Sequence, residues 1–125
     1  MLLLFSISFT QLTAQTLKRK YRGIYTGQIP SYEVKFGKGT NTVSKCDLKV
    51  YISRDSLKLE IGTYSYASGY TFEIAEQDLI LTAPREQSGI PEQFILSPRT
   101  KTILRKGHYP QPDATLIRIG KLPRR

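Results

Sequence analysis

The stretch KCDLKVYISRDSLKLEI, from Lys45 to Ile61, holds two runs of alternating polar and apolar residues joined by four polar residues. A period of two is typical of a β-strand with one face on a core and the other in water. If Arg54 and Asp55 form the tip of the turn, Lys49 lies opposite Glu60, and this register is favoured by opposite charges outside. The apolar pairs expected inside are Leu48 with Ile61, Val50 with Leu59 and Ile52 with Leu57.

The same alternation recurs along the chain, for example over residues 32–36 and 70–74. No apolar stripe with the period of a helix follows residue 15. We therefore expect an all-β fold, an antiparallel up-and-down meander of about eight or nine short strands. It can close as a barrel or as a two-sheet sandwich, and the barrel is favoured because it leaves no sheet edge exposed. The residues expected to point inward are Tyr32, Val34, Phe36, Leu48, Val50, Leu59, Ile61, Phe72 and Ile74.

The first fourteen residues, MLLLFSISFTQLTA, carry no charge and include an apolar run from Leu2 to Phe9. A membrane-spanning helix needs about 20 apolar residues, so this run is too short to cross a bilayer. It is long enough for a secretory leader, and Ala14 supplies the small residue before a cleavage site. We expect residues 1–14 to be a signal peptide and residues 15–125 to be one exported domain, periplasmic or extracellular, without a transmembrane segment. The alternative is that the run forms a first β-strand.

The chain of 125 residues has a formal net charge of +9, and almost all of the excess lies near its two ends. Because the first and last strands of a closed meander are neighbours, the ends should combine into one basic surface. An acidic envelope component, such as a polysaccharide, a lipid headgroup or an acidic protein, would suit it, and a solvated face that only aids solubility is the alternative. Nucleic acid is not expected, because Tyr25, one of three tyrosines near the basic segments, sits where a core residue is expected. Export would also remove the protein from most nucleic acid. The basic surface comprises Lys18, Arg19, Lys20, Arg22, Lys121, Arg124 and Arg125.

Residues that could carry chemistry are few. The single histidine, His108, has no cysteine or carboxylate at ligand spacing, so neither a metal site nor a cofactor is expected. The chain has no Gly-x-Ser-x-Gly elbow and no phosphate-binding loop, and we expect no enzyme activity. The single cysteine, Cys46, shares the phase of Leu48 and Val50 and is expected to be a small core residue.

The triplet Gly23-Ile24-Tyr25, followed by a β-meander, resembles the start of the lipocalin-like (calycin) barrels. In that family a Gly-x-Trp opens the barrel and an arginine near the last strand packs over the tryptophan. Here Tyr25 stands at the place of the tryptophan and Arg118 at that of the arginine, a pairing worth about 0.5–2 kcal/mol where a guanidinium covers a ring.

The resemblance implies that the protein binds a small apolar or amphipathic ligand in the barrel mouth. A small barrel can also be filled by its own side chains. The alternative function is therefore an envelope interaction protein with a filled β core, which binds an acidic partner through the basic surface. The residues expected to contact a small ligand are Tyr25, Tyr32, Phe36, Tyr64, Tyr66, Tyr70, Phe72 and Arg118.

Overall fold

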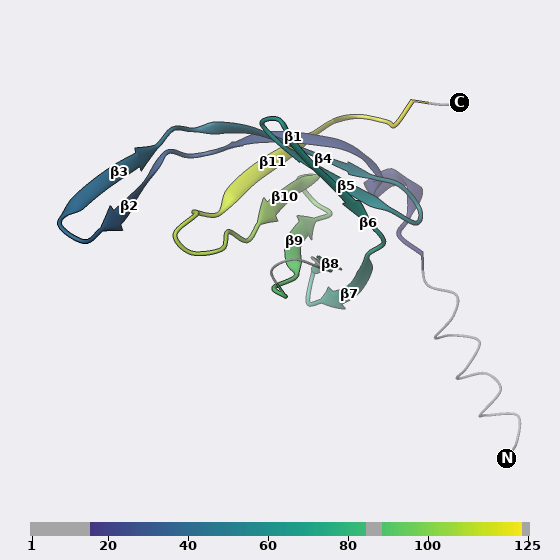
Figure 1. Ribbon diagram of the computed structural model, residues 1–125. Coiled ribbons are helices and arrows are strands. Elements are labelled where there is room, and N and C mark those ends of the chain that lie inside the picture. Colours follow the sequence, from purple (N-terminus) through teal and green to yellow (C-terminus); the bar gives the residue numbers. More distant parts are fainter. Residues whose placement is uncertain (1–15, 85–88, 124–125) are drawn as a thin grey trace, which may run out of the picture.

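The computed structural model describes residues 16–84 and 89–123 (Figure 1). The predicted signal peptide over residues 1–14, and the strand that is its alternative, lie outside the described residues. Arg124 and Arg125 also lie outside them. Among the described residues, no helix has both the length and the apolar character needed to cross a membrane.

The described chain contains eleven strands and one short 3-10 helix, so the predicted all-β fold is confirmed. In chain order the elements are η1 (Arg19–Tyr21), β1 (Gly23–Ile29), β2 (Tyr32–Phe36), β3 (Gly39–Val43), β4 (Cys46–Ile52), β5 (Leu57–Ile61), β6 (Tyr64–Ser68), β7 (Thr71–Ala75), β8 (Asp78–Ala83), β9 (Glu92–Ser97), β10 (Thr102–Arg105) and β11 (Ala114–Gly120).

Nine of these strands form one antiparallel sheet in the order β6-β5-β4-β1-β11-β10-β9-β8-β7. The sheet curls into a half-barrel (Figure 1). The first and last strands, β1 and β11, are paired as expected for an up-and-down meander. The two edges of the sheet, β6 and β7, follow each other in the chain. The barrel-like arrangement favoured by the sequence is therefore confirmed, with an open seam between β6 and β7.

The hairpin of β4 and β5 has the register expected from its alternation. Lys49 lies opposite Glu60, and the three apolar pairs are those predicted. The turn is closed by the Ser53 amide, which donates to the Ser56 carbonyl oxygen at 2.9 Å. The local pattern was sufficient here because turn length and alternation together fix the register of a hairpin.

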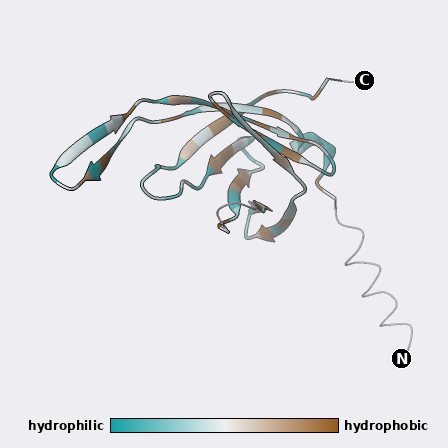
Figure 2. Cartoon of the chain, in the orientation of Figure 1, coloured by the Kyte–Doolittle hydropathy of each residue, from teal (hydrophilic) through white to brown (hydrophobic). Residues whose placement is uncertain are grey.

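The inner face of the half-barrel is filled by one cluster of buried apolar side chains. Figure 2 shows hydrophobic residues, in brown, along the strands of the half-barrel. Leu48, Val50 and Leu59 are buried there as expected. Leu17, which precedes η1, is only 1% exposed and belongs to the same cluster. The segment before β1 is therefore anchored in the core. The prediction that Cys46 is a core residue is wrong, because Cys46 is half-buried where β4 meets the β2–β3 hairpin.

Strands β2 and β3 form a separate two-stranded sheet that projects from the half-barrel as an arm (Figure 1). The prediction that Val34 and Phe36 point into the core is wrong, since Val34 is half-buried and Phe36 is 61% exposed. Tyr32, at the base of the arm, is half-buried and packs against the core cluster. The hairpin does alternate polar and apolar residues, but no second layer of described residues covers its apolar face.

The inward prediction also fails for Ile74, which is 67% exposed. It lies near the end of β7, an edge strand of the sheet. Phe72, two residues earlier on the same face, is half-buried and packs against the core cluster. A residue at the end of an edge strand has too few neighbours to be covered, although it has the phase of a core residue.

Candidate functional site

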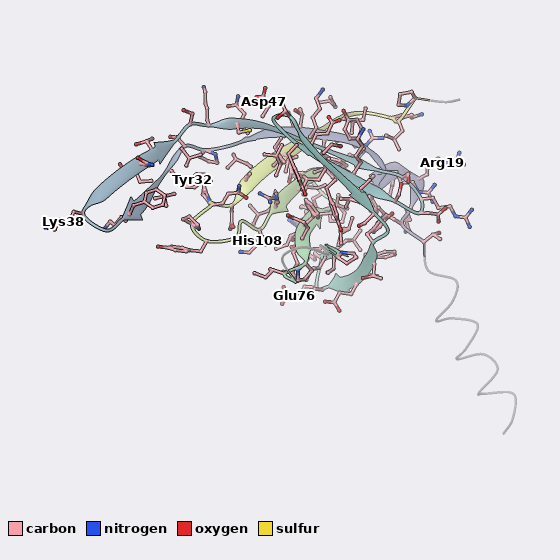
Figure 3. All side chains as sticks on the ribbon, viewed as in Figure 1. Arg19, Tyr32, Lys38, Asp47, Glu76 and His108 are labelled. Atoms are coloured by element: carbon pink, nitrogen blue, oxygen red, sulfur yellow. The ribbon has the colours of Figure 1, made fainter. Side chains whose placement is uncertain are left out.

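A cavity of about 760 Å³ opens at the end of the half-barrel that lies away from the arm. Four segments meet there: η1, the start of β1, the turn between β4 and β5, and the end of β11. In Figure 3, Arg19 marks this end of the molecule and Lys38 marks the tip of the arm at the other end. The lining residues are Arg19, Lys20, Arg22, Gly23, Ser53, Arg54, Arg118, Lys121 and Leu122. We call this the basic cavity.

Six of the residues that line the basic cavity are lysine or arginine, and none is acidic. Within the described part of the chain, the only ion pair made by these six joins Arg54 to Asp55, at 4.0 Å between two exposed side chains. An exposed pair of this kind contributes little, and the other five cations have no carboxylate partner among residues 16–84 and 89–123. Like charges around one cavity raise its positive potential, which attracts an anion.

Two of the guanidinium groups are held by backbone carbonyls. Arg22 Nε donates to the Leu17 carbonyl oxygen at 2.9 Å, and Leu17 is itself fixed in the core. Arg118 Nε donates to the Arg22 carbonyl oxygen at 3.1 Å. Neither arginine makes a hydrogen bond through its terminal nitrogens to another described residue. The two groups are therefore oriented and keep donors for the paired oxygens of a carboxylate or phosphate.

Gly23 lets β1 and β11 approach each other beside the cavity. Its φ of +139° is a conformation that other residues rarely adopt, and a Cβ there would lie 2.3 Å from the Gly120 carbonyl oxygen. The same Cβ would lie 3.1 Å from Arg118 Nε. The glycine of Gly23-Ile24-Tyr25 thus makes room for the arginine that faces the basic cavity.

Tyr25 lies in the core behind the cavity and does not line it. Its hydroxyl donates to the Tyr21 carbonyl oxygen at 2.7 Å. Burial raises the pKa of Tyr25 to about 12, and the nearby positive charge of Arg118 opposes part of that shift. The phenol therefore stays neutral over the physiological range and fixes the backbone at the end of η1.

The residues of the predicted basic surface are only partly brought together. Arg19, Lys20, Arg22 and Lys121 line the basic cavity, whereas Lys18 lines another cavity of about 310 Å³. The sequence did not indicate Arg54, which lies in the turn after β4. The pairing of β1 with β4 places that turn beside the chain ends. The two strands are separated by β2 and β3 in the chain, so a local sequence pattern does not predict their pairing.

The residues predicted to contact a small ligand lie in several places. Tyr25 is in the core, and Phe36 is exposed on the arm. Tyr32 and Tyr64 line a cavity of about 350 Å³ at the base of the arm. Phe72 lines the cavity of about 310 Å³ beside β7 and β8.

Three more residues were predicted to contact a small ligand. Tyr66 lies on β6, Tyr70 lies between β6 and β7, and Arg118 lies on β11. Tyr66 is half-buried on β6. The Tyr70 hydroxyl donates to the Ser53 carbonyl oxygen at 2.7 Å, so it holds the turn that borders the basic cavity. Arg118 lines the basic cavity. The described residues contain no group of three or more side chains of the kind that could hold a metal ion.

No protein-family model, curated protein or solved structure matches the chain. The resemblance to lipocalin-like barrels therefore stays a prediction.

Proposed function

We propose that the protein is a non-catalytic binding protein that takes an acidic partner at the basic cavity. The observation that carries this proposal is the gathering of six cationic side chains, from both ends of the chain and from one turn, around a cavity of about 760 Å³. Five of them have no carboxylate partner in the described chain. Their mutual repulsion is relieved when an anion binds.

The filled core supports this proposal over an apolar ligand inside the barrel. Leu48, Val50 and Leu59, three of the residues expected to point inward, are buried in one packed cluster. Three further inward candidates, Val34, Phe36 and Ile74, lie on the arm or at an edge strand. A binding protein with a filled β core is therefore the better supported of the two functions considered from the sequence.

The chemistry of the basic cavity favours phosphate or carboxylate groups. The forked guanidinium groups of Arg22 and Arg118 match two oxygens of such a group better than a point cation does. If the chain is exported, as its first residues predict, an acidic component of the cell envelope is the partner that fits.

The test measures binding of inorganic tripolyphosphate to the full chain by calorimetry at about 0.15 M salt, where exposed charges are screened beyond roughly 8 Å. One variant combines Arg19→Ser, Lys20→Ser and Lys121→Ser. These side chains are exposed and make no hydrogen bond or ion pair to described residues, so the fold should persist. We expect the dissociation constant to rise at least about tenfold, or about 1.4 kcal/mol.

The matched control removes the same charge elsewhere, with Lys35→Ser, Lys38→Ser and Arg99→Ser. The first two lie on the arm and its turn, and the third lies between β9 and β10. We expect this control to change the dissociation constant by less than about threefold, because only distant, screened charges are lost. Equal weakening in both variants would mean that net charge alone drives binding, and the proposal would then be wrong.

A further inference from the structure

A second cavity, of about 350 Å³, opens at the opposite end of the half-barrel, where the arm begins. On one side it is lined by Tyr32, Ile61 and Tyr64 from β2, β5 and β6. On the other side it is lined by Arg105, His108 and Gln111 from β10 and the following loop. Figure 3 shows Tyr32 at the base of the arm and His108 below it. We call this the aromatic cavity.

The one formal charge that borders the aromatic cavity is neutralised. Arg105 is only 1% exposed, and its Nε and Nη2 donate to the two carboxylate oxygens of Glu92 at 3.0 and 3.1 Å. Its Nη1 donates to the Gln111 side-chain oxygen. Three of the five guanidinium N–H groups are therefore engaged, and the adjacent buried carboxylate cancels the charge. Among the described residues, no lysine and no arginine without a carboxylate partner lines this cavity, in contrast with the basic cavity.

The other side chains of the aromatic cavity are amphipathic. Because the Gln111 oxygen accepts from Arg105, the Gln111 amide group keeps its NH₂ as a donor. His108 Nε2 lies 3.2 Å from the Pro91 carbonyl oxygen, which can only accept, so Nε2 carries the hydrogen. In the neutral ring, Nδ1 is then an acceptor. Tyr32 and Tyr64 add two ring faces with hydroxyl groups.

The loop that carries His108 and Gln111 is held in place. The backbone N–H of Gln111 donates to the His108 carbonyl oxygen at 2.8 Å. The Gly107 amide donates to Asp113 Oδ1 at 2.8 Å, and Lys106 Nζ donates to Asp113 Oδ2 at 3.2 Å. A site whose loop is ordered before binding loses less entropy when the ligand arrives.

We propose that the aromatic cavity binds a neutral saccharide unit. A sugar ring has apolar faces that suit the tyrosine rings, and its hydroxyl groups can both donate to and accept from the imidazole, amide and phenol groups. The volume is at the lower end of the range for small-molecule sites, about 300–1,000 Å³, which suits one or two sugar rings. This site is separate from the basic cavity, and the proposal does not depend on the one made for that cavity.

The test uses saturation-transfer difference NMR on the full chain with glucose, galactose, N-acetylglucosamine and cellobiose as probes. We expect at least one of them to bind with a dissociation constant below about 10 mM, within the range of weak small-ligand binding. Raising the salt from about 0.05 M to about 0.5 M should change this constant less than about twofold, because the ligand is neutral. If none of the four sugars binds, the proposal is overturned.

Variants locate the binding. Tyr64 is 44% exposed, so Tyr64→Ala should leave the fold intact while weakening binding about tenfold, as the loss of an aromatic anchor does. Phe36→Ala removes an exposed ring outside the cavity and should leave the dissociation constant unchanged. His108→Ala is a second variant from the other side of the cavity and should also weaken binding. Sugar binding that neither Tyr64→Ala nor His108→Ala weakens would contradict the assignment.

Discussion

Tyr25 and Arg118 lie directly opposite each other in the ladder of β1 and β11, and they bind the last residue of η1 and the residue after it. The Tyr25 hydroxyl donates to the Tyr21 carbonyl oxygen from the core side. Arg118 Nε donates to the Arg22 carbonyl oxygen from the side of the basic cavity. The pairing expected from the sequence therefore exists as neighbouring positions, but the guanidinium acts through a hydrogen bond to the backbone. The cation–π contacts found among the described residues involve other side chains.

Tyr25→Phe should lower the free energy of unfolding by about 0.5–1.5 kcal/mol, because the Tyr21 carbonyl oxygen loses its donor. Urea denaturation measures this change. The control is Tyr109→Phe, which removes a hydroxyl from a side chain that is 98% exposed and should cost less than about 0.5 kcal/mol. Equal effects of the two variants would show that the Tyr25 hydroxyl does not contribute as a buried anchor.

Stability should fall at alkaline pH as Tyr25 begins to ionise in the unfolded chain. Its pKa is raised from 10.0 to about 12 in the folded state, mainly by burial. Between these values the unfolded chain loses the proton while the folded chain keeps it, so stability is full below pH 10 and decreases as the pH rises towards 12. Denaturant unfolding at several pH values measures this. Between pH 10 and 12 the free energy of unfolding should fall more steeply with pH for the natural chain than for Tyr25→Phe. Identical slopes would contradict the shift.

Gly27→Ala should destabilise the protein by about 1–3 kcal/mol, the range expected for an overpacked site. A Cβ on Gly27 would lie 2.3 Å from the Thr115 carbonyl oxygen, and relief requires β1 and β11 to separate. Gly120→Ala is the matched control in the same pair of strands, because no atom lies within 4 Å of its added Cβ. Thermal unfolding should separate the two variants clearly, and a Gly27→Ala variant as stable as the control would refute the close approach.

Removing one member of the buried pair of Arg105 and Glu92 should be more harmful than removing both. Arg105→Met removes the guanidinium that binds both oxygens of the buried Glu92 carboxylate, which should cost about 3–5 kcal/mol. Combining it with Glu92→Met should recover much of this loss, because no charge is then buried. The midpoints of thermal unfolding test this order, and a double variant less stable than Arg105→Met would contradict it.

The arm should contribute little to the stability of the half-barrel. Phe36→Ala should cost less than about 0.5 kcal/mol, since its ring is mostly exposed. Leu48→Ala, in the core, should cost about 2–5 kcal/mol. Denaturant titrations of the two variants compare the sites. Comparable losses would restore the sequence-based prediction that Phe36 belongs to the core.

The basic cavity could be predicted in part. The sequence places cations near both chain ends, and closure of a meander brings its first and last strands together, so Arg22 and Lys121 were expected to be neighbours. Arg54 and the oriented state of Arg118 were not predicted. The pair of Glu92 and Arg105 was also missed, although Glu92 shares the phase of the buried Phe94 on β9. That phase was the available signal. Charged residues are rarely buried without a partner, so the sequence alone favoured the surface for Glu92.

The sequence by itself determined the all-β class and one hairpin register, because alternation and turn length act over a few neighbouring residues. Only the tertiary structure decided what covers each apolar face. The runs at residues 32–36 and 46–52 alternate alike, yet Phe36 is exposed on the arm and Val50 is buried in the half-barrel. Burial depends on which distant strand lies opposite, and alternation carries no information on that. The same long-range pairings brought Arg54 to the chain ends and Tyr64 towards His108, and so made the two cavities.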